Sequence, residues 1–140
     1  MEAWEIQQKI NGLKWRRSEL ESEISQLEDK KEYLQKEYSR KTRQASQMSS
    51  FYAKKRSDAL TLKGDAKGNA VLQMLDQYGI AYGAGNEEKI ASSIRSVQAY
   101  LKSNCDNIDE RIEYARGRIS SINWEIYCYE KDLRNMESEV

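Results

Sequence analysis

The side chains most used in catalysis and metal binding are few in this chain, and their spacing restricts their chemistry. The 140 residues include no histidine, which excludes a Ser-His-Asp or Cys-His nucleophilic site and a His-containing zinc site. The two cysteines, Cys105 and Cys128, lie 23 residues apart in what reads as one helix, or about 35 Å. That distance is far too great for an intramolecular disulfide, so we expect free thiols in a reducing compartment.

The carboxylates and glycines also lack a catalytic pattern. The 23 aspartates and glutamates fall at helical spacings at which i,i+4 partners are ordinary surface features. No G-x-x-x-x-G-K-[ST] phosphate loop occurs in the sequence. We therefore expect a protein that is not an enzyme and that uses no metal and no cofactor.

Long helices are the elements that must carry these residues. The chain has no proline, whereas average usage would give about seven, and proline breaks helix interiors. Apolar residues keep a 3-4 spacing over residues 6–38, with only Arg17 and Lys31 polar, and a second such ladder covers residues 108–140. This spacing is typical of coiled coils.

The two ladders predict an all-α fold, a long antiparallel two-helix hairpin of coiled-coil type with a short helix and a glycine-bearing loop at its tip. We expect arm one at about residues 3–62, the tip at about 63–86 and arm two at about 87–140, in a single domain over residues 1–140. Pairing the ladders end to end places opposite each other residues whose numbers sum to about 146.

The expected tip has its own composition. Five of the seven glycines lie between residues 64 and 85, and glycine punctuates helices. Between these glycines, residues 70–78 are expected to form one short amphipathic helix. Asn86 then reads as the N-cap of the second arm, because asparagine is favoured at that position.

All three tryptophans fall outside the ladders. Trp4 and Trp15 are eleven residues apart, three helical turns, so they share one outer face. Trp124 has Tyr127 beside it, and the expected pairing places all three tryptophans toward the open end of the hairpin. Tryptophan and tyrosine anchor protein interfaces, and a large exposed apolar patch usually marks one. We predict that Trp4, Trp15, Trp124 and Tyr127 form a docking face for another helical protein.

Alternatives to this docking face stay open. A homodimer or a four-helix bundle could bury the same residues against a second copy, and a wider intramolecular core could also include them. Residues 39–57 hold six lysines and arginines, no acidic residue, and two aromatic rings, a combination that can bind nucleic acid. Because the whole chain is neutral, with a pI of about 6.4, a solvated face or an acidic partner is favoured over nucleic acid.

Targeting signals are not evident at the N-terminus. It carries Glu2, Glu5 and Lys9 and no apolar run of seven or more residues, so it does not read as a secretory signal peptide. No stretch approaches the roughly 18 apolar residues of a membrane span. We expect a cytoplasmic protein which, if it leaves the cell, leaves by a route that reads no cleaved signal.

The overall plan resembles the small helical proteins of type VII (ESX) secretion. The run NIDERIEYARGRISSINWEIYCYEKDL is similar to the second helix of the longer accessory proteins encoded beside LXG-type toxins. The Trp-x-Gly turn of the WXG family is absent, which favours the accessory group. Tyr33 and Glu37 match the Tyr-x-x-x-Asp/Glu export signal of such systems, although within the N-terminal arm.

The resemblance implies a function in helix-on-helix binding. A member of this group would bind the helical N-terminal domain of a toxin, alone or with a second small helical protein, and would act as a chaperone or targeting factor for export. In a long hairpin with a second apolar face, further helices can pack on that face and complete a helical bundle. The alternative is a self-associating coiled-coil structural protein.

Overall fold

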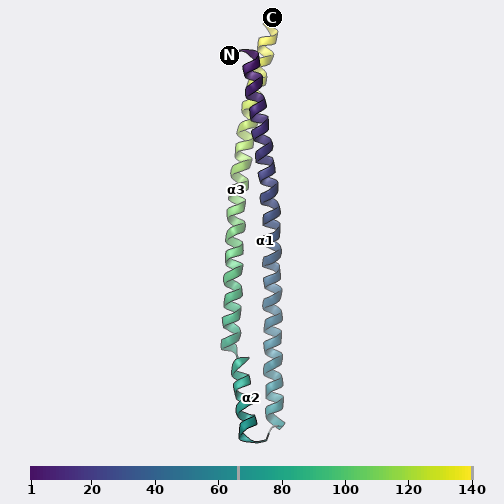
Figure 1. Cartoon of the computed structure of the whole chain (residues 1–140), viewed down its shortest axis with the longest axis vertical. Coiled ribbons are helices and arrows are strands. Elements are labelled where there is room, and N and C mark those ends of the chain that lie inside the picture. The colour runs from purple at the N-terminus through teal and green to yellow at the C-terminus, as the bar shows by residue number, and fades with distance from the viewer. Residues whose placement is uncertain (66, 140) are drawn as a thin grey trace. The chain divides into compact units, whose positions relative to one another are not determined.

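The structure is a computed structural model that describes residues 1–65 and 67–139. The element order is α1 (Ala3–Asp65), α2 (Asn69–Ala81) and α3 (Ala84–Ser138) (Figure 1). Within these described residues there is no strand. The predicted all-α fold of helical-hairpin type is confirmed, and so is the short helix predicted at residues 70–78, which α2 contains.

Local capping explains where α1 begins. The backbone N–H of Glu2 donates to the carboxylate of Glu5 at 2.9 Å, which satisfies a donor that the first helical turn leaves unpaired. Glu5 also places a negative charge in the first turn, and Lys63 places a positive charge in the last turn. Both charges complement the helix dipole, and no proline interrupts the 63 residues between these ends.

The chain divides into two compact units, Met1–Tyr33 with Asn104–Val140 (unit 1) and Leu34–Ser103 (unit 2). Unit 1 pairs the first half of α1 with the last part of α3 in antiparallel orientation. Its core is a continuous apolar cluster, with partly buried residues such as Leu13 and Ile119 packed against it. The fully buried members of this cluster are Ile6, Ile10, Leu20, Ala115, Ile122 and Ile126.

The polar positions in the unit 1 seam have partners on the facing helix. Arg17 donates to Asn123 at 2.9 Å, and Lys31 forms an ion pair with Asp109 at 2.6 Å. The hydrogen bond from Lys31 to the Asp109 side chain is the largest cause that raises the pKa of Lys31 above its ordinary value of 10.5. The two polar interruptions in the ladder are therefore satisfied across the pair.

These bonds correct the predicted helix register. Arg17 with Asn123 and Lys31 with Asp109 both give residue numbers that sum to 140, not about 146 as predicted. A heptad seam repeats every seven residues. Two apolar ladders therefore pack almost equally well in two registers that differ by one heptad. The polar partners distinguish these registers, and the observed register is about one heptad from the predicted one.

Unit 2 joins the second half of α1 to α2 and the start of α3. Its seam includes polar contacts, since Gln98 donates to the carbonyl of Tyr38 at 3.2 Å and to the hydroxyl of Thr42 at 2.7 Å. Among the described residues of unit 2, only Ala59 is a buried apolar residue. Leu62, at the end of the predicted first arm, is 58% exposed.

Glycines shape both turns of unit 2. Gly68 has a φ of 95°, a left-handed conformation that glycine adopts without steric cost. At the other turn, a Cβ on Gly83 would lie 3.1 Å from the carbonyl oxygen of Ile80. The backbone N–H of Gly83 donates to that same oxygen at 3.0 Å, so the close approach closes the end of α2.

Asn86 has a different role from the predicted N-cap. It lies inside α3, and its side-chain amide donates to the carbonyls of Ile80 at 3.3 Å and Ala81 at 3.1 Å. These carbonyls belong to the last turn of α2, where no intrahelical donors remain. Asn86 therefore caps the C-terminal end of α2, and the N-cap prediction is wrong because α3 begins two residues earlier, at Ala84.

Candidate functional site

The outer face of α1 in unit 1 carries two of the tryptophans. Trp15 lies midway between the seam positions Leu13 and Arg17, so it points away from α3, about 200° from each seam residue. Trp4 lies within about 20° of Trp15 around the helix. Each indole is 66% exposed, a high value for the largest apolar side chain.

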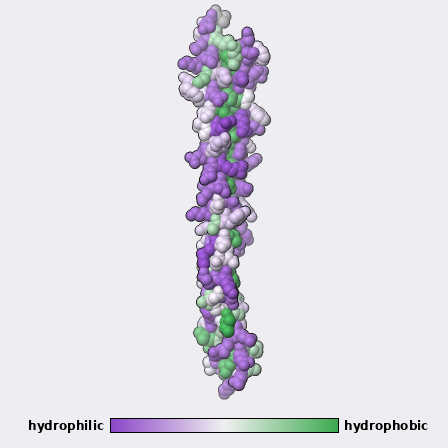
Figure 2. All heavy atoms as spheres, turned by 90° about the vertical axis from the view of Figure 1, so that its left-hand side faces the viewer, coloured by the Kyte–Doolittle hydropathy of each residue, from purple (hydrophilic) through white to green (hydrophobic). Residues whose placement is uncertain are grey.

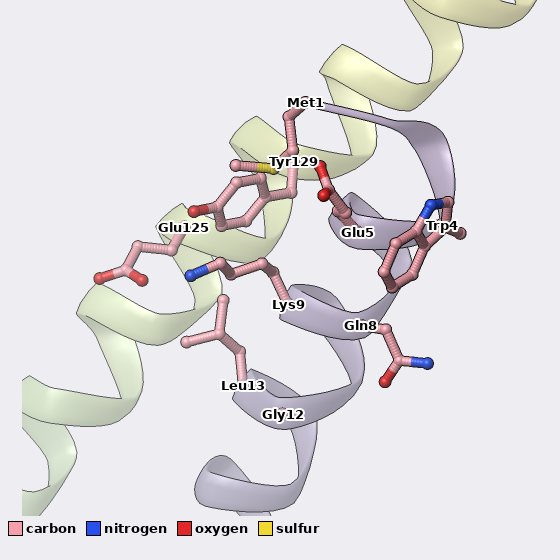
Figure 3. Close-up of a pocket in the computed structure, with 9 residues that line it drawn as sticks. All are labelled: Met1, Trp4, Glu5, Gln8, Lys9, Gly12, Leu13, Glu125 and Tyr129. Carbon is pink, nitrogen blue, oxygen red and sulfur yellow. The ribbon is translucent and has the colours of Figure 1, made fainter.

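A groove lies beside Trp4 where α1 starts. It has a volume of about 730 Å³. Figure 3 shows Lys9, Leu13 and Tyr129 extending into the space between α1 and α3, with Trp4 on the side of α1 away from α3. The residues around the groove are Met1, Trp4, Glu5, Gln8, Lys9, Gly12, Leu13, Glu125 and Tyr129. The groove joins the helix seam to the exposed face around Trp4.

The outer face of α3 carries the other two predicted docking residues. Trp124 and Tyr127 stack on each other, with ring centroids 5.5 Å apart and planes 25° apart. Their exposed fractions are 65% and 50%. The structure therefore brings these two rings together as one aromatic platform. Stacked rings of this kind present a wide, rigid apolar surface.

The two aromatic faces lie on opposite sides of unit 1. Since Arg17 pairs with Asn123, Trp15 stands nearly level with Trp124 along the helix pair. Trp124, however, lies midway between the buried Ile122 and Ile126, about 200° from each, so it points away from α1. A single flat partner surface cannot cover both Trp15 and Trp124. They form two outer faces.

Each aromatic face also contains a glycine in the middle of a helix. Gly12 lies one turn before Trp15, and Gly117 lies two turns before Trp124. Nothing lies within 4 Å of the position that a Cβ would take at either glycine. An interior helix glycine costs about 1 kcal/mol relative to alanine, and the packing of unit 1 does not need one here. A glycine on an exposed face does allow the backbone of another chain to approach closely.

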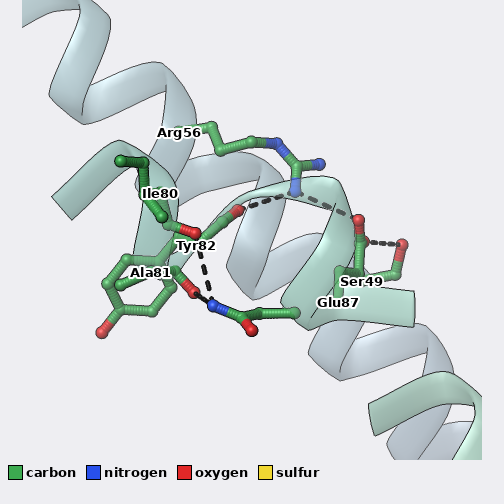
Figure 4. A network of polar contacts seen from close by, with 7 residues as sticks. Ser49, Arg56, Ile80, Ala81, Tyr82 and Glu87 are labelled. Atoms are coloured by element: carbon green, nitrogen blue, oxygen red, sulfur yellow. Dashed lines mark hydrogen bonds and ion pairs between the residues drawn. The ribbon is translucent and has the colours of Figure 1, made fainter. Parts of the chain in front are cut away.

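The basic segment at residues 39–57 lies in unit 2 and is held by a polar network. Arg56 donates to the carbonyl of Tyr82 at 2.9 Å and to the carboxylate of Glu87 at 3.1 Å, and Ser49 donates to the same carboxylate at 3.1 Å (Figure 4). Glu87 is only 19% exposed. The network fastens the start of α3 to α1, so Arg56 has a structural partner within the chain.

The rings of this region pack mainly on one another. The centroid of the Tyr82 ring lies 5.8 Å from that of Phe51, 5.3 Å from that of Tyr52 and 4.7 Å from that of Tyr78. Lys55 lies over the Phe51 ring, 5.2 Å from its centroid. This tyrosine cluster (Phe51, Tyr52, Tyr78 and Tyr82) joins α1 to α2 and to the residue that follows α2.

The remaining candidates carry little chemistry. Cys105 and Cys128 are half-buried free thiols. Tyr33 is 63% exposed, while Glu37 pairs with Arg40 at 3.3 Å. Over residues 1–65 and 67–139 no cluster of three or more acidic, cysteine or histidine side chains could hold a metal ion. None of the helices in that part of the chain has the length and apolar character required to cross a membrane.

The sequence interpretation missed a set of exposed aliphatic side chains around the α1–α2 turn. Leu60, Leu62, Met74 and Ile80 are 58–73% exposed, and Val71 is 46% exposed. The available signal was that α2 carries a single charged residue, Asp76, in thirteen positions. A short helix of such composition either is buried or presents apolar surface, and here none of its residues is buried.

Comparison with known protein families, with curated proteins and with solved structures finds no match to this chain.

Proposed function

We propose that this chain is a non-enzymatic helical adaptor or chaperone. It binds the helical N-terminal domain of a type VII secretion substrate, an LXG-type toxin, in the cytoplasm and helps to target it for export. The observation that carries this proposal is the pair of outward aromatic faces on a unit whose own core is already closed. Trp4 and Trp15 form one face, and Trp124 with Tyr127 forms the other.

The closed core is the first support for binding by these faces. Ile10 and Ala115 are each 2% exposed, so unit 1 already buries its seam without the tryptophans. Leaving an indole two-thirds exposed forgoes the gain from burying its apolar surface. Aromatic anchors of this kind dominate the energetics of protein interfaces.

The type of partner follows from the geometry of each face. Both faces are stretches of straight helix with a glycine one or two turns before the tryptophan, which suits a second helix lying close alongside. Because the faces point in opposite directions, a partner must supply at least two helices, one on each side. A toxin N-terminal domain made of long helices would complete such a bundle.

A direct binding titration tests the proposal. The purified chain is titrated with the purified N-terminal domain of an LXG-type toxin, by calorimetry. We expect Trp15→Ala and Trp124→Ala each to weaken binding by tenfold or more, which corresponds to about 1.4 kcal/mol. Tyr100→Ala is the matched control, because Tyr100 is 68% exposed in unit 2, and it should bind as the wild type does.

Two results would count against the adaptor. Absence of binding to the toxin domain would remove the proposed partner. Self-association of the chain that both tryptophan variants abolish would favour the alternative, a coiled-coil structural protein that covers these faces with a second copy.

A further inference from the structure

Unit 2 contains a seam lysine, Lys41, that has no counter-ion among the described residues. It continues the 3-4 spacing of the α1 ladder after Tyr38 and is half-buried. In unit 1 the ladder cations Arg17 and Lys31 each bond a side chain of the facing helix. Lys41 instead donates to the side chain of Gln44, one turn further along its own helix, at 3.1 Å. A half-buried ammonium group is stabilised when a carboxylate comes within reach.

The facing part of α3 turns only half of its aliphatic ladder inward. Ile90, Ile94, Val97 and Leu101 keep a 3-4 spacing, and Ile94 and Leu101 are half-buried. Ile90 and Val97 are 38% and 42% exposed, while Gln98 bonds to α1 in the seam. Because Ile90 and Val97 are seven residues apart, they lie in line on one flank of the helix. Over unit 2, the face seen in Figure 2 shows hydrophobic atoms exposed between hydrophilic ones.

A groove brings this flank of α3 together with two lysines. It has a volume of about 300 Å³, and the residues that line it are Lys41, Lys89, Ile90, Ser93, Ile94 and Val97. These six residues include no carboxylate and no aromatic ring. Aliphatic side chains and two cations therefore border one open space.

Neither lysine of the groove forms an ion pair within the part of the chain that the structure describes. The carboxylates closest to them in sequence are held by arginines. These pairs are Glu37 with Arg40, Glu87 with Arg56, and Glu88 with Arg95. Lysines and arginines also outnumber aspartates and glutamates in unit 2 as a whole, so the field around the groove attracts anionic groups.

We propose that this groove binds an acidic amphipathic helix of a partner protein. The apolar side of that helix covers Ile90, Ile94 and Val97, and its carboxylates pair with Lys41 and Lys89. Apolar residues seven positions apart on one flank match the heptad spacing of apolar residues on another helix. The groove lies in unit 2 and the aromatic faces of the proposed adaptor lie in unit 1, so the two contacts do not depend on each other.

The two lysines also set the spacing of the partner's carboxylates. Gln98 bonds Thr42, the residue after Lys41, and lies nine residues after Lys89. Nine residues of helix span about 14 Å. A helix that lies along the groove should therefore carry its carboxylates about two to three turns apart, or about seven to eleven residues.

Nucleic acid fits this groove less well. Single strands bind through exposed aromatic rings on which bases stack, and no ring lines the groove. Phosphates would pair with the two lysines but would leave Ile90 and Val97 uncovered. An amphipathic helix satisfies the cations and the aliphatic side chains together.

A peptide titration with the full chain tests the proposal. The probe is a dye-labelled peptide of three heptads with leucine at positions a and d and glutamate at e and g. A second peptide carries lysine in place of every glutamate. Binding is followed by fluorescence anisotropy at about 0.15 M salt, where charges more than about 8 Å apart are largely screened. We expect the acidic peptide to bind and the basic peptide not to bind.

Two pairs of lysine variants separate the groove from the net charge of unit 2. Lys41→Gln/Lys89→Gln should weaken binding of the acidic peptide by about fivefold, because two partly exposed ion pairs are lost. Lys54→Gln/Lys67→Gln removes the same charge from outside the groove and should change binding by less than about twofold. Glutamine is a good helix former, so both variants should retain the helical circular dichroism of the wild type.

A pair of valine variants tests the apolar part of the contact. Val97→Gln should weaken binding of the acidic peptide severalfold, because the peptide then buries less apolar surface. Val71 in α2 is similarly exposed, at 46%, and does not line the groove. Val71→Gln should therefore bind as the wild type does, and so should Trp15→Ala in unit 1.

Four results would overturn the proposal. The first is no binding of the acidic peptide at this salt concentration. The second is equal weakening by the two lysine pairs, which would show attraction to net charge alone. The third is a loss of binding in Trp15→Ala but not in Lys41→Gln/Lys89→Gln, which would place the peptide on an aromatic face. The fourth is a single-stranded oligonucleotide that displaces the peptide and is itself weakened by Lys41→Gln/Lys89→Gln, which would assign the groove to nucleic acid.

No toxin domain enters this test. Its failure and failure of the adaptor proposal are therefore distinguishable.

Discussion

Unit 1 and unit 2 share the long helices α1 and α3 but are stabilised in different ways. Unit 1 contains a run of buried isoleucines and leucines such as Ile10 and Ile122. The two polar positions of its α1 ladder, Arg17 and Lys31, are each bonded across the pair. Among its described residues unit 2 buries one apolar side chain, that of Ala59, and it relies on the Arg56–Glu87 network and the tyrosine cluster. A repeating apolar seam adds stability along the whole helix pair. Polar contacts are directional, so they fix one arrangement of a turn.

The difference extends to the surfaces that each unit leaves exposed. Unit 1 has a net negative charge and presents aromatic faces, which suit protein partners. Unit 2 has twelve lysines and arginines against six aspartates and glutamates, whereas unit 1 has eleven against seventeen. Unit 2 also leaves aliphatic side chains such as Leu60 and Met74 exposed.

Truncation of the seam should affect unit 1 far more than unit 2. Ile10 is 2% exposed, and Ile10→Ala should lower the free energy of unfolding by about 2–5 kcal/mol. The matched change Ile94→Ala removes a half-buried seam residue of unit 2 and should cost about 1 kcal/mol, because less apolar surface is lost. Urea denaturation followed by circular dichroism measures both, and equal losses would contradict the contrast.

Loss of the polar network should loosen unit 2 alone. Arg56→Ala leaves the Glu87 carboxylate without its cation and removes the bond to the carbonyl of Tyr82. Because Arg56 is about one-third exposed, we expect a local cost of only about 1 kcal/mol.

Hydrogen–deuterium exchange measures this local loosening. Amides of residues 82–90 should exchange several times faster in Arg56→Ala, with those of residues 6–27 unchanged. Arg40→Ala, which removes a pair within one exposed helical turn, is the control and should have no effect on either segment. Equal acceleration in the two units would show that the network does not act locally.

The outer-face glycines should separate stability from binding. Gly12→Ala and Gly117→Ala meet no neighbouring atom within 4 Å, so each should raise the free energy of unfolding by up to about 1 kcal/mol. If a partner helix lies close against these faces, the same methyl groups should weaken its binding severalfold. Thermal melts and the calorimetric titration measure the two effects, and unchanged binding would place the partner elsewhere.

Lys31 should give unit 1 a small pH dependence in the alkaline range. Asp109 raises the pKa of Lys31 above 10.5 through their hydrogen bond. A cation with a raised folded pKa stabilises the fold fully below its unfolded pKa, and the contribution is lost as pH rises through the folded pKa. The variant Lys31→Arg stays charged in this range. At pH values above 10.5 the stability of the wild type relative to this variant should therefore decrease by a small amount. A constant difference would show that this pair is not coupled to folding.

The sequence was sufficient for features that repeat with the helical period. Ile10 and Ile122 could be assigned to the core because apolar residues recur every three or four positions. Trp15 and Trp124 lie midway between seam residues, so their exposure could be predicted. The prediction placed them on one docking face, however, whereas in the structure they point in opposite directions.

Features that depend on partners distant in sequence could not be predicted. The register was wrong by about one heptad because apolar ladders are degenerate, and only the pairs of Arg17 and Lys31 resolve it. Asn86 was assigned to the wrong helix end because its acceptors lie at the end of α2. Exposure of Met74 and Ile80 depends on which side of α2 meets α1, and the composition of a short helix does not determine that side.

The central claim is that the aromatic faces of unit 1 are open in the free chain and become covered by a partner. Intrinsic tryptophan fluorescence tests it directly, since all three tryptophans belong to these faces. If the faces are open, we expect a water-like emission that soluble quenchers reduce strongly at every protein concentration. Addition of the toxin N-terminal domain should then cause a blue shift and protection from quenching. A blue-shifted, quencher-resistant emission in the free chain, increasing with protein concentration, would contradict it.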